Sequence, residues 1–240
     1  MFKNRFVYFV IALFQIIIGT FLFSKVANAA EPKFMITWKS SNYAPSWFDG
    51  KIFPINNSSI TVSFEAISQN KEDFGKILDL KDKEVRWYIN GDQVGSGYGK
   101  KLFSFKNGDF SGSDIDIRIS LEYFDVELEK SYFVDKYFVI PIKSPEIIIE
   151  NKSFSSQYPI GSKINLRAIP LFFNSLPELL NIQWNINNKI IENIFPNLLE
   201  AQINIESEIP GNRIRVNVFG NKLGSPSESG ASTIFLNIIK

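Results

Sequence analysis

The sequence predicts an all-β protein with two antiparallel β-sandwiches in tandem, preceded by an N-terminal signal or anchor helix. Three observations support this prediction. Beyond residue 30 the apolar residues recur with a period of two, a strand containing tryptophan occurs twice, 97 residues apart, and an apolar run lies close to the N-terminus. A length of 240 residues suits one large domain or two small ones.

Composition excludes several classes of function. Hydrophobic residues make up 45% and charged residues 21%, as in ordinary globular proteins, and a net charge of +1 leaves no basic surface for nucleic acid. Cysteine and histidine are absent. Disulfides, zinc, haem or iron–sulfur sites built on those residues, and nucleophiles that depend on histidine are therefore excluded. We expect no cofactor, no metal and no enzymatic activity.

The N-terminus reads as an export segment, residues 1–29. Lys3 and Arg5 precede the apolar run at 6–23, and an Ala-x-Ala site ends at Ala29, so a secretory signal peptide cleaved there is expected. The run is 18 residues long, close to the ~20 that span a bilayer. An uncleaved signal anchor is the alternative, and these residues would be the chain's membrane contact. Cleavage would leave 23 basic and 25 acidic residues, a net charge of −2.

Strict alternation marks the strands of the first half. In 59–67 and 114–123 one face is apolar and the other polar, as expected for half-buried antiparallel strands. Asn90-Gly91, directly after a tryptophan strand, predicts a type I′ hairpin turn. Further strands are predicted at 33–39, 84–90, 101–106 and 132–142.

The same plan recurs in the second half. NIQWNINNK at 181–189 matches EVRWYINGD at 84–92. The remaining predicted strands are 145–150, 163–169, 200–206, 213–219 and 232–239. Two copies of about 100 residues with roughly seven short strands each are typical of tandem Ig-like sandwiches. We therefore predict Ig-like domains at 30–143 and 144–240.

Three tryptophans are predicted to lie in the cores. Trp87 and Trp184 are in phase with the apolar residues of their own strands, and Trp38 is in phase with Phe34 and Ile36. In Ig domains with a disulfide the corresponding tryptophan packs on that bridge. Other apolar side chains must take its place here.

Binding residues are predicted in a loop punctuated by proline and glycine, SNYAPSWFDG. Tyr43, Trp47 and Phe48 in this loop form part of a surface contact with a partner or with the neighbouring domain, or else they close the end of the first core. Two other stretches break the strand rhythm: 70–84, where a helical turn is expected around 74–80, and 171–181. The outer faces of the sheets are expected to be polar.

Three motifs favour ordinary structure over chemistry. GSGYGK at 95–100 lacks the spacing and the following helix of a phosphate loop, and indicates a connection between strands. NGDFSGSDID at 107–116 has oxygen ligands for calcium, but the twelfth position of an EF-hand loop would be Arg118. Paired carboxylates occur in no recognisable catalytic arrangement.

Several of these motifs resemble a group of exported tandem Ig-like or PKD-like proteins from reduced-genome bacterial lineages. The shared motifs are WKSSNYAPSWFDGK, WYING, GSGYGK, YPIGS, AIPLFF and WNINN, and the resemblance extends from about residue 34 to the end. The chain departs from the pattern at Leu171, where an aromatic is usual, and at Asn188, where glycine is usual. The resemblance implies the fold and export, and it brings no catalytic residues.

The expected function is that of a non-catalytic exported structural or interaction protein of the cell envelope or exterior. Its localisation would be extracytoplasmic: secreted, periplasmic or anchored at the cell surface. A protein or a glycan at that surface is the expected kind of partner. The alternative is a carbohydrate- or peptide-binding module that uses the loop aromatics.

Overall fold

A computed structural model of the chain describes residues 31–108, 113–125, 129–153, 155, 157–191, 197–205 and 211–239. Within these ranges the regular elements are strands, apart from one short 3₁₀ helix. No helix in the described part of the chain is long and apolar enough to cross a bilayer. The expected export segment, residues 1–29, lies outside the described residues.

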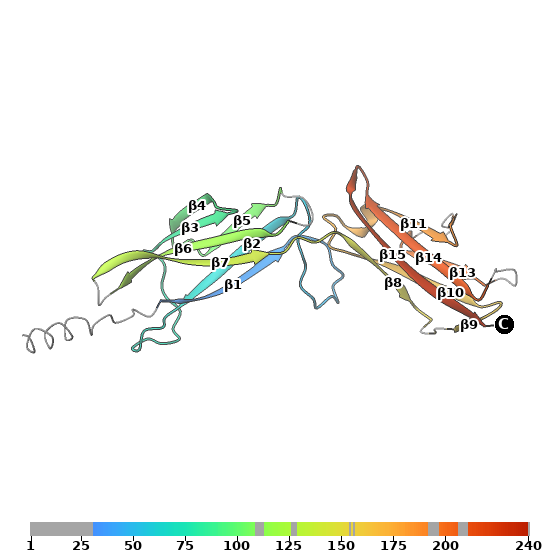
Figure 1. Cartoon of the computed structure of the whole chain (residues 1–240), viewed down its shortest axis with the longest axis horizontal. Coiled ribbons are helices and arrows are strands. Elements are labelled where there is room, and N and C mark those ends of the chain that lie inside the picture. Colours follow the sequence, from blue (N-terminus) through green and yellow to red (C-terminus); the bar gives the residue numbers. More distant parts are fainter. Residues whose placement is uncertain are drawn as a thin grey trace, which may run out of the picture.

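The first half forms two antiparallel sheets (Figure 1). Its strands are β1 (Lys33–Ser40), β2 (Ser59–Ile67), β3 (Glu84–Ile89), β4 (Asp92–Tyr98), β5 (Leu102–Lys106), β6 (Ile115–Asp125) and β7 (Lys130–Ile140). One sheet has the order β1-β2-β5 and the other β4-β3-β6-β7. Their inward side chains share one apolar core, made of alternate residues of β2, β3, β6 and β7 together with the partly buried aromatics of β1 and β5.

The second half repeats this arrangement. Its elements are β8 (Glu146–Asn151), β9 (Gln157–Pro159), β10 (Lys163–Leu171), the 3₁₀ helix η1 (Pro177–Leu179), β11 (Leu180–Ile186), β12 (Lys189–Ile191), β13 (Glu200–Asn204), β14 (Arg213–Lys222) and β15 (Ser225–Ile239). The sheets have the orders β8-β10-β13 and β12-β11-β14-β15-β9, antiparallel except that β9 pairs with β15 in parallel. A second, separate core lies between them.

Apart from the additional edge strand β9, strand order is therefore the same in the two halves. The three-stranded sheet β1-β2-β5 corresponds to β8-β10-β13, and β4-β3-β6-β7 corresponds to β12-β11-β14-β15. Two antiparallel sheets packed over a core of alternating inward residues make an Ig-like sandwich. The repeat recognised in the sequence is thus a repeat of the whole sandwich.

The two tryptophan strands are equivalent in atomic detail. Trp87 and Trp184 are each only 1% exposed. The indole Nε1 of Trp87 donates a hydrogen bond to the carbonyl of Lys100 at 3.0 Å, and that of Trp184 donates to the carbonyl of Leu198 at 3.1 Å. In each copy the only polar group of the ring is therefore hydrogen-bonded to a backbone carbonyl that follows the next hairpin in the chain. This bond fixes the orientation of the ring in the core.

The hairpins after these strands use the same asparagine. Asn90 and Asn187 have φ of 49° and 46°, and each amide oxygen accepts a hydrogen bond from the backbone N–H of the neighbouring long strand, at Asp116 and Arg215 respectively. The next residue also has positive φ in both copies, 93° at Gly91 and 69° at Asn188. Asparagine tolerates the left-handed region, so Asn188 keeps the turn although glycine is usual there.

Two local expectations were wrong. Residues 74–80 contain no helical turn, because Ile77 pairs in a β-bridge with Ile67 and the segment folds back along β2. The GSGYGK stretch is not merely a connection, since Gly95 to Tyr98 belong to strand β4. Of the stretch 107–116 considered for calcium, residues 109–112 lie outside the described residues.

Candidate functional site

The two sandwiches lie end to end, and the junction between them is the candidate site (Figure 1). The long loop after β1 meets the segment after β10 there. The backbone N–H of Phe172 donates to the carbonyl of Tyr43 at 2.7 Å, and the N–H of Tyr43 donates to the carbonyl of Phe173 at 2.7 Å. Two backbone hydrogen bonds therefore join segments that are about 130 residues apart.

An apolar cluster distinct from the two cores surrounds these bonds. Its buried members are Ile55 from the first half and Ile169, Leu171 and Phe172 from the second. The ring of Phe172 makes edge-to-face contacts with two rings of the first half, Phe48 at 5.9 Å and Phe53 at 5.7 Å between centroids. Such aromatic pairs contribute about 0.5–1.5 kcal/mol each beyond the area they bury.

Phe172 has an unusual backbone conformation. Its φ is +65°, a region that costs a side-chain-bearing residue roughly 1–2 kcal/mol. The conformation turns the chain so that the N–H of Phe172 faces Tyr43 while its ring enters the cluster. Strain of this kind persists where surrounding contacts determine the geometry, and here those contacts all come from the junction.

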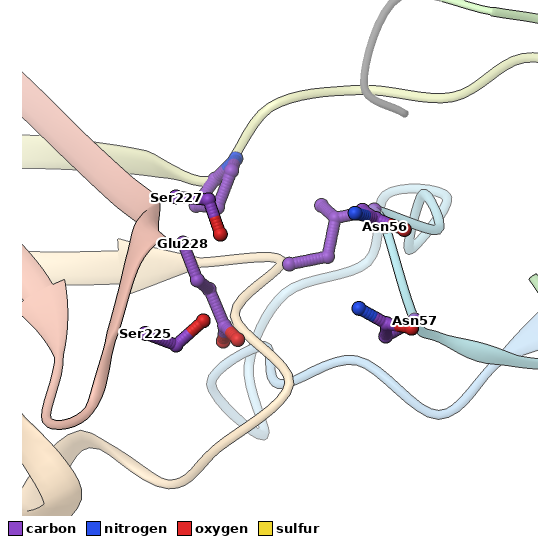
Figure 2. Close-up of a pocket in the computed structure, with 7 residues that line it drawn as sticks. Asn56, Asn57, Ser225, Ser227 and Glu228 are labelled. Atoms are coloured by element: carbon purple, nitrogen blue, oxygen red, sulfur yellow. The ribbon is translucent and has the colours of Figure 1, made fainter. Parts of the chain in front are cut away.

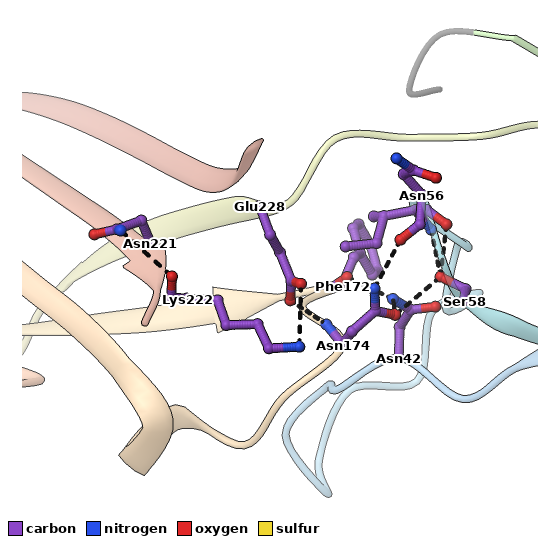
Figure 3. A network of polar contacts seen from close by, with 9 residues as sticks. Asn42, Asn56, Ser58, Phe172, Asn174, Asn221, Lys222 and Glu228 are labelled. Atoms are coloured by element: carbon purple, nitrogen blue, oxygen red, sulfur yellow. Dashed lines mark hydrogen bonds and ion pairs between the residues drawn. The ribbon is translucent and has the colours of Figure 1, made fainter. Parts of the chain in front are cut away.

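A polar network lies beside the cluster (Figure 3). The side chain of Asn174 is at its centre: its Oδ1 accepts from Asn42 Nδ2 at 2.9 Å and from Ser58 Oγ at 3.1 Å, and its Nδ2 donates to the carbonyl of Asn56 at 2.7 Å. Asn42 Nδ2 also donates to the carbonyl of Phe172 at 2.8 Å. One amide of the second sandwich therefore binds three residues of the first.

A buried carboxylate supports this network from the second sandwich. Glu228 is 7% exposed, and its Oε1 accepts a hydrogen bond from the backbone N–H of Asn174 at 2.6 Å. Lys222 Nζ lies 3.6 Å from Oε2 and supplies the opposite charge. A buried carboxylate needs such partners, because an unpaired one would cost several kcal/mol. Nothing in the sequence around Glu228 indicated this role, since its partners come from distant segments.

The pocket at the junction is small (Figure 2). Its volume is about 70 Å³, and it is lined by Ile55, Asn56, Asn57, Pro145, Ser225, Ser227 and Glu228. Sites for small-molecule ligands are typically ~300–1,000 Å³. Glu228 is the pocket's single ionisable group, whereas acid–base hydrolysis of the glycosidase type uses two carboxyls. The pocket is therefore large enough for a few water molecules or a small group of atoms.

The structure places the predicted binding residues in two different environments. Tyr43 and Phe48 are partly buried against the second sandwich, and burial, followed by the negative charge of Glu178, raises the pKa of the Tyr43 phenol. Trp47, between them, is 58% exposed. Trp38 is partly buried against the first core and has Lys51 Nζ 4.0 Å from its ring centroid.

The outer face of the larger first-half sheet is less polar than expected. The guanidinium of Arg118 lies 3.7 Å from the ring centroid of Tyr88, and a hydrogen bond with Tyr137 raises the pKa of Arg118. Arg86 similarly lies 4.0 Å from the ring centroid of Phe133. Cation–π contacts of this kind pair the two arginines with rings of the same sheet, while Tyr137 on this face remains 65% exposed.

We expect Asn174→Ala to lower the free energy of unfolding by about 2 kcal/mol, because the buried Asn42 amide loses one of its acceptors and the carbonyl of Asn56 loses its donor. Urea unfolding of the full chain measures the effect. Asn181→Ala is the matched control, since Asn181 is exposed and its contact with Asn221 is long, 3.5 Å. Equal stability of the two variants would contradict the role assigned to Asn174.

No protein-family model matches the chain, and no curated protein matches it. Solved structures with similarity include three N-terminal domains of the bacteriophage RB49 highly immunogenic outer capsid protein, at 10% identity and a TM-score of 0.41, with 86% of this chain and 59% of that chain covered. The chain thus spans about three fifths of that fragment.

Two further solved structures also have low scores. Fibronectin(III)-like modules of Clostridium thermocellum CbhA align at 10% identity and a TM-score of 0.27, covering 85% of this chain and 93% of theirs. Domains 4 and 5 of the S-layer protein SbsC align at 12% identity and a TM-score of 0.31, covering 88% and 100%. With TM-scores below 0.5, none of these similarities indicates what the chain binds.

Proposed function

We propose that this chain is an exported, non-catalytic structural or interaction protein of the cell envelope or exterior. In this proposal residues 30–143 and 144–240 are Ig-like domains held as one stiff unit. The junction is the observation that carries the proposal. Its buried apolar cluster, backbone pair and Asn174 network join the two sandwiches, as a spacer or scaffold that keeps two surfaces at a set separation requires.

The size of the junction pocket supports a non-catalytic role: at about 70 Å³ it is small for a substrate. The sequence resemblance to exported tandem Ig-like or PKD-like bacterial proteins remains a prediction, and it supports the same function.

Export is tested by protease accessibility and intact mass in bacterial cells that express the full chain. We expect the sandwiches outside the cytoplasmic membrane, because Lys3 and Arg5 before the apolar run direct the chain to the export machinery. The mass distinguishes a chain beginning at Ala30 from one that retains residues 1–29. A full-length chain protected inside the cytoplasm would overturn the proposal.

Trp47 favours a second candidate function, the binding of a glycan or peptide through loop aromatics. Its ring is 58% exposed beside the junction, whereas Tyr43 and Phe48 are engaged with the second sandwich. Exposed tryptophan suits contact with a sugar or an extended peptide. In this case Trp47→Ala would keep the fold and weaken association with envelope material, and unchanged association would exclude the second candidate.

A further inference from the structure

Exposed apolar side chains gather at the end of the first sandwich that lies farthest from the junction. We call this surface the distal end and define it by Phe74, Ile77, Tyr98 and Phe124, which are 71%, 63%, 72% and 42% exposed. Exposed apolar residues scattered singly need no explanation, but several at one pole of a sandwich indicate a contact surface.

The strand register places these residues together. Tyr98 pairs with Glu84 at the start of β3, and the backbone N–H of Glu84 donates to a carboxylate oxygen of Glu122, two residues before Phe124. Loop 68–83 leads directly into this strand and contains Phe74 and Ile77. Figure 1 shows that loop, between β2 and β3, at the pole where β1 begins.

The loop that carries Phe74 is firmly built. Ser68 organises it: its N–H donates to the carbonyl of Lys76 at 2.9 Å, its carbonyl accepts from Gly75 at 3.0 Å, and its hydroxyl donates to Asp73 Oδ1 at 2.6 Å. Asn70 Nδ2 donates to Tyr123 Oη at 3.0 Å, which fastens the loop to β6. This hydrogen-bonded turn keeps the side chain of Phe74 exposed to solvent, so its exposure is a feature of the fold.

The described chain also begins at this pole. Lys33 in β1 pairs with Ile67, the residue before the loop. Nine residues, 24–32, lie between the apolar run 6–23 and Lys33 at the start of β1. Fully extended, nine residues reach ~30 Å. If the apolar run stays in a bilayer, the start of β1 therefore lies within about that distance of the membrane surface.

We propose that the first sandwich stands on a lipid bilayer, with the distal end in contact with the headgroup region and residues 6–23 retained as its anchor. Aromatic and aliphatic side chains at a rigid tip suit the interface, where tyrosine and phenylalanine are favourable. Residues 71–83 carry four lysines and four acidic residues, so this loop has no net charge, and we expect the contact not to require anionic lipid.

This inference rests on the export segment of the proposed function and adds that the segment remains uncleaved. The cysteine-free chain allows single labels. Phe74→Cys carries an environment-sensitive fluorophore at the distal end, and Leu223→Cys, which is 67% exposed on the second sandwich, is the matched control. Both full-length proteins are reconstituted in phosphatidylcholine vesicles, with and without spin-labelled or anionic lipid.

We expect the label at position 74 to emit at shorter wavelength and to lose fluorescence with spin-labelled lipid, equally in neutral and anionic vesicles. The label at 223 should behave as in water. Water-like emission at both positions would overturn the inference, and so would contact that requires anionic lipid. A chain found outside the membrane but beginning at Ala30 would also overturn it while leaving the proposed function intact, whereas cytoplasmic retention would remove the proposed function itself.

Discussion

Replacing Trp87 or Trp184 with alanine is expected to lower the free energy of unfolding of its own sandwich by about 3–5 kcal/mol, the range for truncating a buried aromatic ring. Both rings are 1% exposed, and each loses its indole hydrogen bond on truncation. Trp87 in addition contacts two rings of the opposite sheet, Phe64 at 5.7 Å and Phe103 at 5.5 Å between centroids. No disulfide crosses either core, so these contacts are not reinforced covalently.

Chemical denaturation followed by near-UV circular dichroism measures this loss. Trp47→Ala is the matched control, because its exposed ring should change stability by less than ~0.5 kcal/mol. A loss below about 1 kcal/mol at either buried site would contradict its place at the centre of a core. Reducing agent should change none of these values, since the chain has no cysteine.

Phe172→Ala is expected to lower the free energy of unfolding of the full chain by about 3–5 kcal/mol. It should also release the two sandwiches from their fixed arrangement. The ring is 5% exposed and contacts Phe48 and Phe53 of the first half. The two cores do not include this residue, so each sandwich should remain folded. Small-angle scattering should then report a broader distribution of shapes at unchanged strand content.

Glycine at the same position separates ring contacts from backbone strain. Alanine keeps the strain of a positive φ, whereas glycine removes ~1–2 kcal/mol of it and returns roughly 0.5–1 kcal/mol through chain entropy. Phe172→Gly should therefore be no less stable than Phe172→Ala, although both lose the ring. Phe219→Ala, at an exposed ring of β14, is the control. A less stable glycine variant would show that Phe172 is not strained.

Local pattern was sufficient for most strands. In β2 and β6 the alternation of apolar and polar residues predicted which side chains face the core, because successive side chains of a strand point to opposite faces. The tryptophan strands and their Asn-Gly or Asn-Asn turns could also be identified from the sequence, because each strand and its turn lie within ten residues of one another. Segment 74–80 failed because its charged and apolar residues suit a helix locally, whereas pairing of Ile77 with Ile67 stabilises an extended path.

The sequence by itself determined the all-β class, the repeat, the tryptophan positions and the turns, since each depends on neighbouring residues. Only the tertiary structure decided the junction and the distal end. Asn42 binds Phe172 across 130 positions, and Glu228 reaches Asn174 across 54. These pairs have no local periodicity, because their geometry depends on how two complete sandwiches meet. The separation of Trp47 from Tyr43 and Phe48 has the same cause: the second sandwich covers the latter two side chains and leaves the ring between them exposed.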